Sequence, residues 1–236
     1  MVRLVLFDVD GTLVRTGGAG VQAFVRVFST EFGIADGVER LRFAGRTDFS
    51  LVREVFQQHG VPATEANFRR FFDRYVFWLD HLLADCRGGA VPGVWDFLRH
   101  LQALPQPPLL GLLTGNIRLG AELKLRRFGL WEVFQIGGFG DDHEDRNQIA
   151  AIAGERGRRV LGESLRGEQV LVVGDTPHDI RCARAIGARA LAVATGGSPL
   201  EELTTHGPDW AVTGLERLDV REVYGRGRKG VQPLKR

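Results

Sequence analysis

The feature that most constrains the fold of this 236-residue chain is an apolar run that ends in two carboxylates. The run lies in LVLFDVDGT, residues 4–12, where Asp8 and Asp10 follow four apolar residues. Two later apolar runs also end in polar residues, LLGLLTGN at Thr114 and QVLVVGDT at Asp175, and a fourth run reads ARALAVAT. Helical patterns separate these runs. That alternation predicts an α/β fold with a doubly wound, mostly parallel sheet.

One interval departs from the alternation. Residues 17–86 carry three amphipathic helical patterns, in VQAFVRVFSTEFG, DFSLVREVFQQHG and EANFRRFFDRYVFWLDHLLADC, and no strand pattern. We therefore predict a core of residues 1–16 and 88–224 and an inserted helical unit of residues 17–87. The last helix bears an aromatic stripe that we expect to form the core of the unit and its contact with the main domain. The stripe consists of Phe68, Phe71, Phe72, Tyr75, Phe77 and Trp78.

Composition limits the class of protein. Cys86 and Cys182 form no CxxC pattern, which argues against a disulfide framework or zinc site and favours a reducing cytoplasm. No apolar run is long enough to span a membrane. Residues 225–236 hold five basic residues and no acid, so the rest of the chain carries −3, five units below the whole chain's +2. We interpret this end as a flexible tail and expect no nucleic-acid partner.

Carboxylates are expected to meet at one edge of the predicted sheet. The carboxyl ends of neighbouring parallel strands line the same crevice. Asp8 and Asp10 are two residues apart and can project to one side, where their repulsion calls for a cation, and Asp175 adds a third carboxylate. Three oxygen donors suit Mg²⁺, which typically joins carboxylates to a substrate phosphate. The alternative is that Asp8 and Asp10 are ordinary acids in an Asp-Gly turn.

The segment GDTPHD also begins a helix. Thr176 fits the N-cap, Pro177 the first helical position and Asp179 the acid that reaches back to the cap. Capping and metal binding are compatible, and we predict that Asp179 orients the site from behind the metal ligands.

Thr114, Gly115 and Asn116 are candidate phosphate ligands. Thr114 offers a hydroxyl, and the next two amides precede a helix whose N-terminus favours anions. An equally compatible interpretation is that Asn116 caps that helix.

Lys124 is the one lysine outside the basic tail, because the others are Lys229 and Lys235. It shares an apolar helical stripe with Ile117 and Phe128, so it needs an anionic partner, either a phosphate or the Asp8 carboxylate. The alternative is a lysine that extends from a helix edge to solvent. Arg146, in DDHEDRNQ, is the rival cation.

Together these residues resemble the four motifs of haloacid dehalogenase superfamily phosphatases: DVDGT, a strand that ends in Thr, a basic residue and GDTPHD. The helical insertion is similar to the helical cap of phosphoglycolate phosphatase-like members. The resemblance implies that Asp8 is the nucleophile, Asp10 the general acid and base, Thr114 a phosphate ligand and Asp175 a Mg²⁺ ligand. Asp8 and the backbone carbonyl of Asp10 would complete the protein's share of the metal shell.

The third motif departs from the family pattern, since many relatives carry Lys-Pro there and this chain contains no Lys-Pro. Either Lys124 or Arg146 supplies the cation, and we favour Lys124. In the cap, the turn FAGRTDFS places Arg46 where it could bind a substrate carboxylate or second phosphate. Thr47 and Asp48 fit an N-cap and first-turn acid equally well.

The predicted function is Mg²⁺-dependent hydrolysis of a small phosphomonoester through an aspartyl-phosphate, with phosphoglycolate as a candidate substrate. We expect a cytoplasmic monomer or homodimer. The alternatives are a dehalogenase, which would need no metal, a phosphomutase, and a non-enzymatic receiver domain with a long-lived phospho-Asp8.

Overall fold

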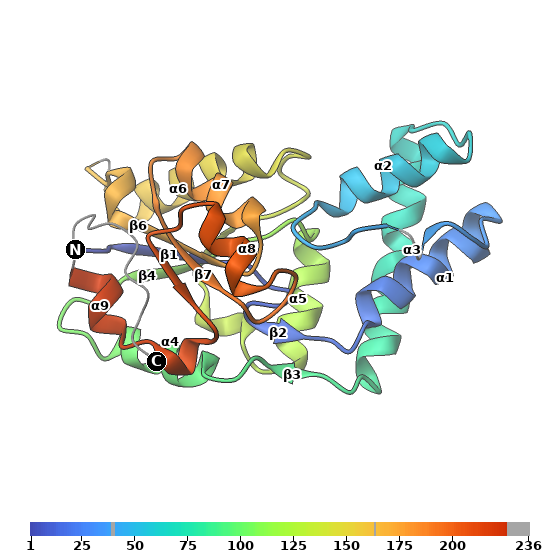
Figure 1. Cartoon of the computed structure of the whole chain (residues 1–236). Helices are drawn as coiled ribbons and strands as arrows, with labels where there is room; N and C mark the ends of the chain where they lie inside the picture. The colour runs from blue at the N-terminus through green and yellow to red at the C-terminus, as the bar shows by residue number, and fades with distance from the viewer. Residues whose placement is uncertain (39–40, 163, 226–236) are drawn as a thin grey trace.

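The computed structural model of the chain describes residues 1–38, 41–162 and 164–225. A sheet flanked by helices forms one part of the molecule, and three further helices stand to one side of it (Figure 1). The elements follow one another in the order β1 (Leu4–Phe7), β2 (Val14–Arg15), α1 (Ala19–Phe32), α2 (Asp48–Gln58), α3 (Glu65–Ala84), β3 (Gly89–Ala90), α4 (Val94–Gln102), β4 (Leu109–Leu113), α5 (Arg118–Arg127), β5 (Ile136–Gly138), α6 (Arg146–Leu161), β6 (Val170–Gly174), α7 (Pro177–Ala185), β7 (Arg189–Val193), α8 (Leu200–Thr205), β8 (Trp210–Val212) and α9 (Val220–Gly225).

The main sheet has the strand order β5-β4-β1-β6-β7-β8, and every neighbouring pair is parallel. This confirms the predicted doubly wound sheet. Phe7 at the end of β1 is paired with Leu112 in β4 and Val173 in β6. The residues that follow these three strands therefore meet at one edge of the sheet. The edge strands β5 and β8 contain three residues each, too short to give a periodic pattern in the sequence.

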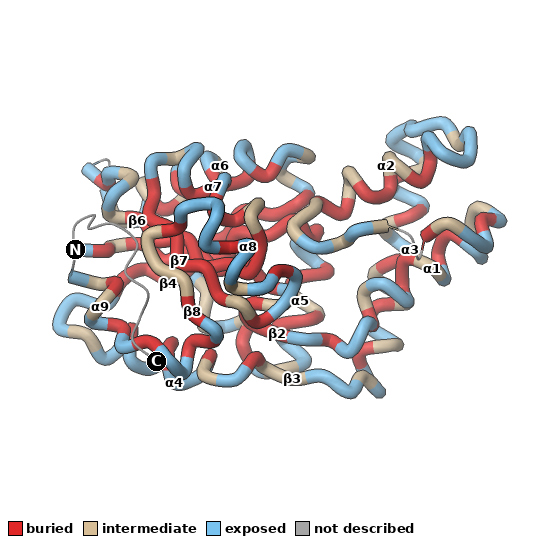
Figure 2. The backbone as a smooth tube through the Cα atoms, viewed as in Figure 1, coloured by how far each residue is buried: buried red, intermediate tan, exposed pale blue. Residues whose placement is uncertain are grey.

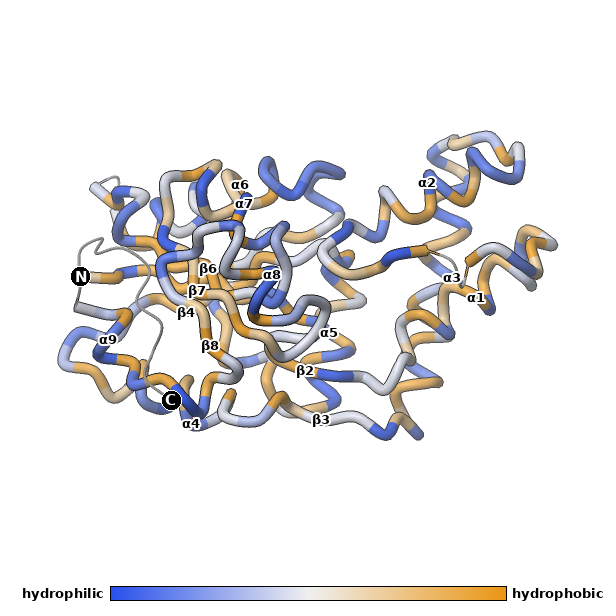
Figure 3. Tube along the Cα trace, viewed as in Figure 1, coloured by the Kyte–Doolittle hydropathy of each residue, from blue (hydrophilic) through white to orange (hydrophobic). Residues whose placement is uncertain are grey.

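Both faces of the sheet are covered, because side chains alternate along each strand. In β1, Val5 and Phe7 belong to one hydrophobic cluster, shared with α4, α5 and α9. Leu4 and Leu6 belong to a second cluster, shared with α6, α7 and α8. Figure 3 shows the central strands as the apolar centre of this part of the molecule. Burial on both faces explains why the strands read as continuous apolar runs.

Helices α1, α2 and α3 enclose a third cluster, built almost entirely from residues 19–83 with Ile117 added from the loop before α5. Their inward sides are buried and their outward sides exposed (Figure 2). The chain crosses between the two parts beside the antiparallel pair β2–β3, where Arg15 lies opposite Gly89. A Cβ atom at Gly88 would lie 2.0 Å from the Arg15 carbonyl oxygen, so this crossing needs glycine. We propose that residues 17–87 form a separate unit, called the cap below.

The aromatic stripe on α3 is only partly internal. Phe68, Phe71 and Tyr75 are buried in the cap cluster, as expected, but Phe77 is 57% exposed, so its assignment to the core was wrong. Phe77 follows two residues after the buried Tyr75, on the outer side of the helix. Both cysteines are free, and no described helix is long and apolar enough to cross a membrane. The predicted basic tail, apart from Gly225 at the end of α9, falls outside the described residues.

Candidate active site

A cavity of ≈ 240 Å³ lies where the carboxyl ends of β1, β4 and β6 face the cap. Its floor comes from the loops that follow these strands, and its roof from α1, α3 and the segment before α2. The sheet contributes most of the predicted site residues to this floor, namely Asp8, Asp10, Thr114, Gly115, Asn116 and Asp175. Lys124 and Arg146 line the cavity from α5 and α6.

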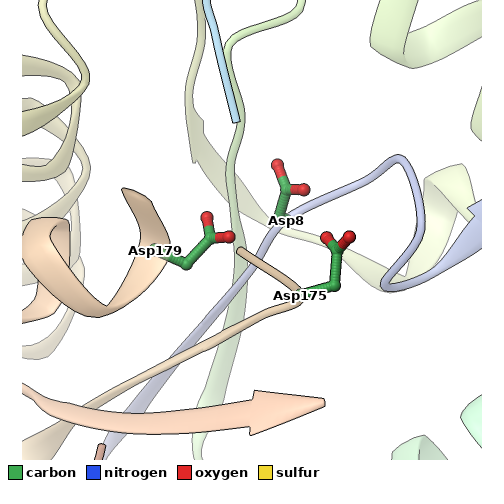
Figure 4. Close-up of side chains that lie close together, drawn as sticks. All are labelled: Asp8, Asp175 and Asp179. Carbon is green, nitrogen blue, oxygen red and sulfur yellow. The ribbon is translucent and has the colours of Figure 1, made fainter. Parts of the chain in front are cut away.

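Three carboxylates, two of which line the floor, converge where β1, β6 and α7 meet (Figure 4). Asp8, Asp175 and Asp179 are all buried, and one oxygen of each lies within 4.8 Å of the others. Asp8 comes from the end of β1, Asp175 from the end of β6 and Asp179 from the first turn of α7. Burial, followed by the charge of Asp179, raises the pKa of Asp175 to about 6. The cluster therefore concentrates negative charge that needs a compensating cation.

Arg146 supplies part of that compensation. Its guanidinium lies 3.3 Å from Asp8 Oδ1 and also donates to Asp179 Oδ1. Burial raises the pKa of Asp8 well above its usual value, and the charge of Arg146 opposes that rise. Arg146 is the first residue of α6, and Asp145 caps this helix through a bond from the Asn147 amide to Asp145 Oδ1 of 2.9 Å. This N-cap bond fixes where α6 starts, and so it directs the Arg146 side chain toward the cluster.

Asp10 has different neighbours. Its Oδ2 accepts from Lys124 Nζ at 2.7 Å and from Asn116 Nδ2 at 2.8 Å, while its side chain remains 45% exposed. Lys124 also donates to Asn116 Oδ1 at 2.6 Å. The lysine is buried, as its apolar stripe indicates, but its carboxylate partner is Asp10, whereas we expected a phosphate or the Asp8 carboxylate. The structure thus gives each of the two motif carboxylates its own cation.

Thr114 and Asn116 form one network at the end of β4. The Thr114 hydroxyl oxygen accepts from Asn116 Nδ2 at 2.7 Å and from the Asn116 amide at 3.2 Å. Its own hydrogen is then free to donate toward the cavity. The expectation that Asn116 caps the next helix was wrong, because the N-cap is Ile117 and has no side-chain cap bond. Asn116 is instead held by Thr114, Asp10 and Lys124.

Asp179 is already fully engaged. Its Oδ2 accepts from the Thr176 amide at 3.0 Å and the Thr176 hydroxyl at 2.6 Å, and its Oδ1 accepts from Arg146. The predicted capping geometry at the start of α7 is therefore present. Asp175 is oriented by Thr12, whose hydroxyl donates to Oδ1 at 3.1 Å, and by the Gly197 amide. Neither Thr12 nor Gly197 was a candidate, since nothing in the sequence marks Gly197 as a neighbour of Asp175.

The cluster fits a hard divalent cation on its own donor chemistry. Three buried carboxylates face one guanidinium, which leaves a net negative charge in a site of low dielectric. Carboxylate oxygens are the ligands that Mg²⁺ prefers. Asp8 Oδ2 accepts no hydrogen bond from any described residue. Asp175 accepts one hydrogen bond on each oxygen from uncharged donors, whereas Asp179 accepts three, one of them from the Arg146 guanidinium. Asp8 and Asp175 therefore keep more capacity for a metal than Asp179 does.

The start of α2 bonds the cap to the core. Thr47 is the N-cap, accepting from the Ser50 amide at 3.2 Å, and its hydroxyl donates to the Glu144 carbonyl at 2.9 Å. Asp48 donates its amide to the Gly115 carbonyl at 2.8 Å. A Cβ at Gly115 would lie 2.1 Å from the Arg46 carbonyl, so glycine lets the two loops approach. Arg46 lines the cavity, but its guanidinium pairs with Glu54 on α2.

Comparison with known proteins places these features in a family. Residues 5–193 match the family of haloacid dehalogenase-like hydrolases. The chain is 27% identical over 212 residues to the phosphoglycolate phosphatase of Synechococcus elongatus, covering 89% of this chain and 92% of that protein. It is 25% identical over 230 residues to the pyrophosphatase PpaX of Halalkalibacterium halodurans, covering 95% and 99%.

A solved structure shares the fold. The crystal structure of a predicted phosphoglycolate phosphatase from Haemophilus somnus superimposes with a TM-score of 0.70, at 22% identity, covering 91% of this chain and 95% of that one. Because only 9% of the chain lies outside the alignment, it includes residues of the cap as well as of the sheet.

Proposed function

The chain belongs to the haloacid dehalogenase-like hydrolases, and from that premise we propose that it is a phosphatase that hydrolyses a small phosphomonoester. Names of relatives support this proposal, since they include phosphoglycolate phosphatases and a pyrophosphatase. The observation that carries it is the pairing of Asp8 with Arg146 beside Asp175, at the floor of a cavity that Asp10 also faces.

Asp8 is proposed as the nucleophile. Its carboxylate oxygen attacks phosphorus, the bond from phosphorus to the leaving oxygen breaks, and an aspartyl-phosphate results. Water then attacks the phosphorus of this intermediate, which restores the carboxylate and releases inorganic phosphate. Two displacements replace one difficult step.

Asp10 is proposed as the general acid and base. It gives a proton to the leaving alkoxide in the first displacement and takes one from the attacking water in the second. Its bonds to Lys124 and Asn116 hold the carboxylate at the cavity, so we propose Lys124 as a residue that positions Asp10. This differs from the role expected for Lys124 as the cation of the third motif.

Arg146 is proposed for that role. Its guanidinium lies beside Asp8, where charge on the transferring phosphoryl group would develop, and Asp179 holds it there. Positive charge at this position stabilises the transition state of phosphoryl transfer. Thr114, Gly115 and Asn116 are proposed as phosphate ligands, with the Thr114 hydroxyl as a donor.

We propose that Asp8, Asp175 and the backbone carbonyl of Asp10 hold Mg²⁺. When bound, the ion offsets charge on the phosphoryl oxygens and on the carboxylates around it. Asp179 is proposed to lie behind the metal ligands, as expected from the sequence, and to orient Arg146, a partner that the sequence did not indicate.

The test is phosphate release from a panel that includes phosphoglycolate and p-nitrophenyl phosphate, with Mg²⁺ and with EDTA. We expect release to need Mg²⁺ and to be lost in Asp8→Asn, with Asp10→Asn impaired most on alkyl phosphates, whose leaving groups need a proton. Asp96→Asn is the control, because Asp96 lies exposed on α4, away from the cavity. Full activity of Asp8→Asn would contradict the proposal, as would a stable phospho-Asp8 without turnover. Transfer of phosphate back to a sugar phosphate would identify a mutase.

A further inference from the structure

The cavity has a second end that the proposed phosphoryl chemistry does not use. Opposite the carboxylates, the cap contributes an apolar wall and two polar groups. The wall consists of Val21, Phe24, Phe43 and Leu51, and the polar groups belong to Asp48 and Tyr75. In a phosphatase this end, called the cap end below, holds the group to which the phosphate is attached.

Both polar groups of the cap end keep hydrogen-bonding capacity. Asp48 Oδ2 accepts from the Ile117 amide at 2.8 Å, but Oδ1 has no hydrogen-bond partner within the described part of the chain. Tyr75 is 1% exposed, and its hydroxyl makes no hydrogen bond to any described residue. Both side chains are buried, but these two atoms remain accessible from the cavity, where a bound molecule can reach them. A ligand that both donates and accepts would satisfy the two groups together.

The charges at the cap end disfavour an anion. The guanidinium of Arg46 is paired with Glu54, and it also donates to the Ser50 carbonyl at 3.3 Å. Two of the three N–H groups of Lys124 already donate hydrogen bonds, to Asp10 and Asn116. Asp48 is left as the carboxylate of the cap end with no salt bridge to a described cation, so a second carboxylate placed beside it would be repelled.

The walls add a size and shape requirement. Tyr75 packs edge-on against Phe24, with ring centroids 4.8 Å apart, and Phe24 meets Phe43 in the same way at 5.4 Å. These rings fix the Tyr75 hydroxyl in place and offer apolar contact to the carbon skeleton of the leaving group. The cavity volume of ≈ 240 Å³ suits a small leaving group.

We infer that the substrate is a monophosphate of a small, uncharged, hydroxyl-bearing alcohol. Asp48 and Tyr75 select it over phosphomonoesters that end in a carboxylate or a second phosphate. The inference rests on the proposed phosphatase function and narrows its substrate class. It also runs against phosphoglycolate, whose carboxylate would face Asp48.

The test uses two substrates that differ at one group. In 2-hydroxyethyl phosphate a CH₂OH group stands where phosphoglycolate has a carboxylate. With Mg²⁺ at pH 8, we expect kcat/KM for 2-hydroxyethyl phosphate to exceed that for phosphoglycolate by about 10- to 100-fold, because the Asp48 carboxylate accepts a hydrogen bond from the hydroxyl and repels the carboxylate. p-Nitrophenyl phosphate is measured alongside as a substrate whose turnover reports the chemistry alone.

Two variants assign the preference to its residues. Asp48→Asn keeps an acceptor for the Ile117 amide and removes the charge, so it should raise kcat/KM for phosphoglycolate and narrow the ratio. Tyr75→Phe keeps the ring packing and should raise KM for 2-hydroxyethyl phosphate more than it lowers kcat. Asp73→Asn, exposed on the same helix as Tyr75, is the matched control and should leave the ratio unchanged.

The outcomes separate the two proposals. Turnover of p-nitrophenyl phosphate with an equal or reversed ratio would overturn the substrate class and leave the phosphatase function standing. A preference for phosphoglycolate that Arg46→Gln removes would also overturn it, since Arg46 would then have left Glu54 for the substrate. Failure to release phosphate from any compound, p-nitrophenyl phosphate included, would overturn both. The ratio of kcat/KM for the two substrates is measured on the unaltered protein, so this test does not depend on whether a variant folds.

Discussion

Replacing Arg146 by methionine tests whether the buried cation holds the acidic cluster together. The Arg146 side chain is 7% exposed, and its partners Asp8 and Asp179 are 7% and 3% exposed. Methionine fills a similar volume but leaves two carboxylates buried without their counter-ion. Removing one partner of a buried ion pair costs about 3 to 5 kcal/mol of unfolding free energy, because the orphaned charge stays out of water.

This loss is large enough to measure by thermal and urea unfolding in the absence of divalent metal. For a chain of this size each kcal/mol lowers Tm by roughly 2 to 4 °C, so Arg146→Met should lower it by roughly 6 to 20 °C. The control is Arg53→Met. Arg53 pairs with Glu144 at 3.0 Å, but both side chains are more than one-third exposed, and such pairs contribute about 1 kcal/mol or less.

A double-variant cycle separates charge from packing. Asp179→Asn removes one of the orphaned carboxylates, so the Arg146→Met/Asp179→Asn protein should be more stable than the sum of the two single changes indicates. If Arg146→Met melts within about 2 °C of the unaltered protein, Arg146 is not the counter-ion of the cluster. Strictly additive losses would show that the destabilisation comes from packing.

Two further predictions concern Asp10 and Asp48. Lys124→Met should lower kcat on alkyl phosphates by about 10²-fold and spare p-nitrophenyl phosphate, whose leaving group needs no proton; equal losses on both substrates would refute the positioning role. Burial raises the pKa of Asp48 to about 7, against the opposing charge of Lys124 and with Asp10 and Asp141 adding to the rise. Its charge is present above that pH and lost below it, so the preference for 2-hydroxyethyl phosphate over phosphoglycolate should fall as the pH drops from 8 to 6. Both substrates share the phosphoryl ionisation, which cancels in the ratio. A ratio of the two kcat/KM values that does not change with pH would show that the Asp48 charge does not select the substrate.

The fold could be predicted because strands that are buried on both faces of the sheet consist of continuous apolar runs in the sequence. Residues 4–7, 109–113 and 170–174 are uniformly buried strands, and each stands out without reference to the others. The short edge strands β5 and β8 carry no such signal. Their pairing is fixed by register with β4 and β7, which depends on contacts between segments far apart in the chain.

The division of labour between the two cations could not be predicted. Lys124 is the one lysine outside the tail and lies on an apolar helical stripe, and these two features correctly indicated that it is buried beside a carboxylate. Which carboxylate it meets depends on how α5 lies against the loop after β1. Arg146 is aimed at Asp8 by the position at which α6 begins, and a shift of one residue on a helix turns a side chain by about 100°. Sequence spacing does not resolve a difference of that size.

Asp48 shows a different limit. As the first residue after the N-cap Thr47, it fits the expected acid of a helix start, and that part of the prediction is confirmed. Its carboxylate nevertheless bonds the Ile117 amide, 69 residues along the chain. The local pattern accounts for the helix and gives no sign of this second contact. Tyr75 was likewise expected as core, and its ring is buried, while its hydroxyl borders the cavity.

The position of β1 in the sheet has a consequence for how the molecule assembles as it is synthesised. β1 is synthesised before both of its neighbours, since Leu4 pairs with Leu109 in β4 and Val170 in β6. Until β6 has left the ribosome, β1 has at least one bare edge, which is a template for pairing with other chains. The cap depends mainly on contacts within residues 19–83 and can form during that wait. We therefore expect the slow step of folding to be closure of the sheet around β1. Fragments that end before β6 should aggregate. The acidic cluster around Asp8 is also incomplete until Asp179, the last of its residues in the chain, has been synthesised.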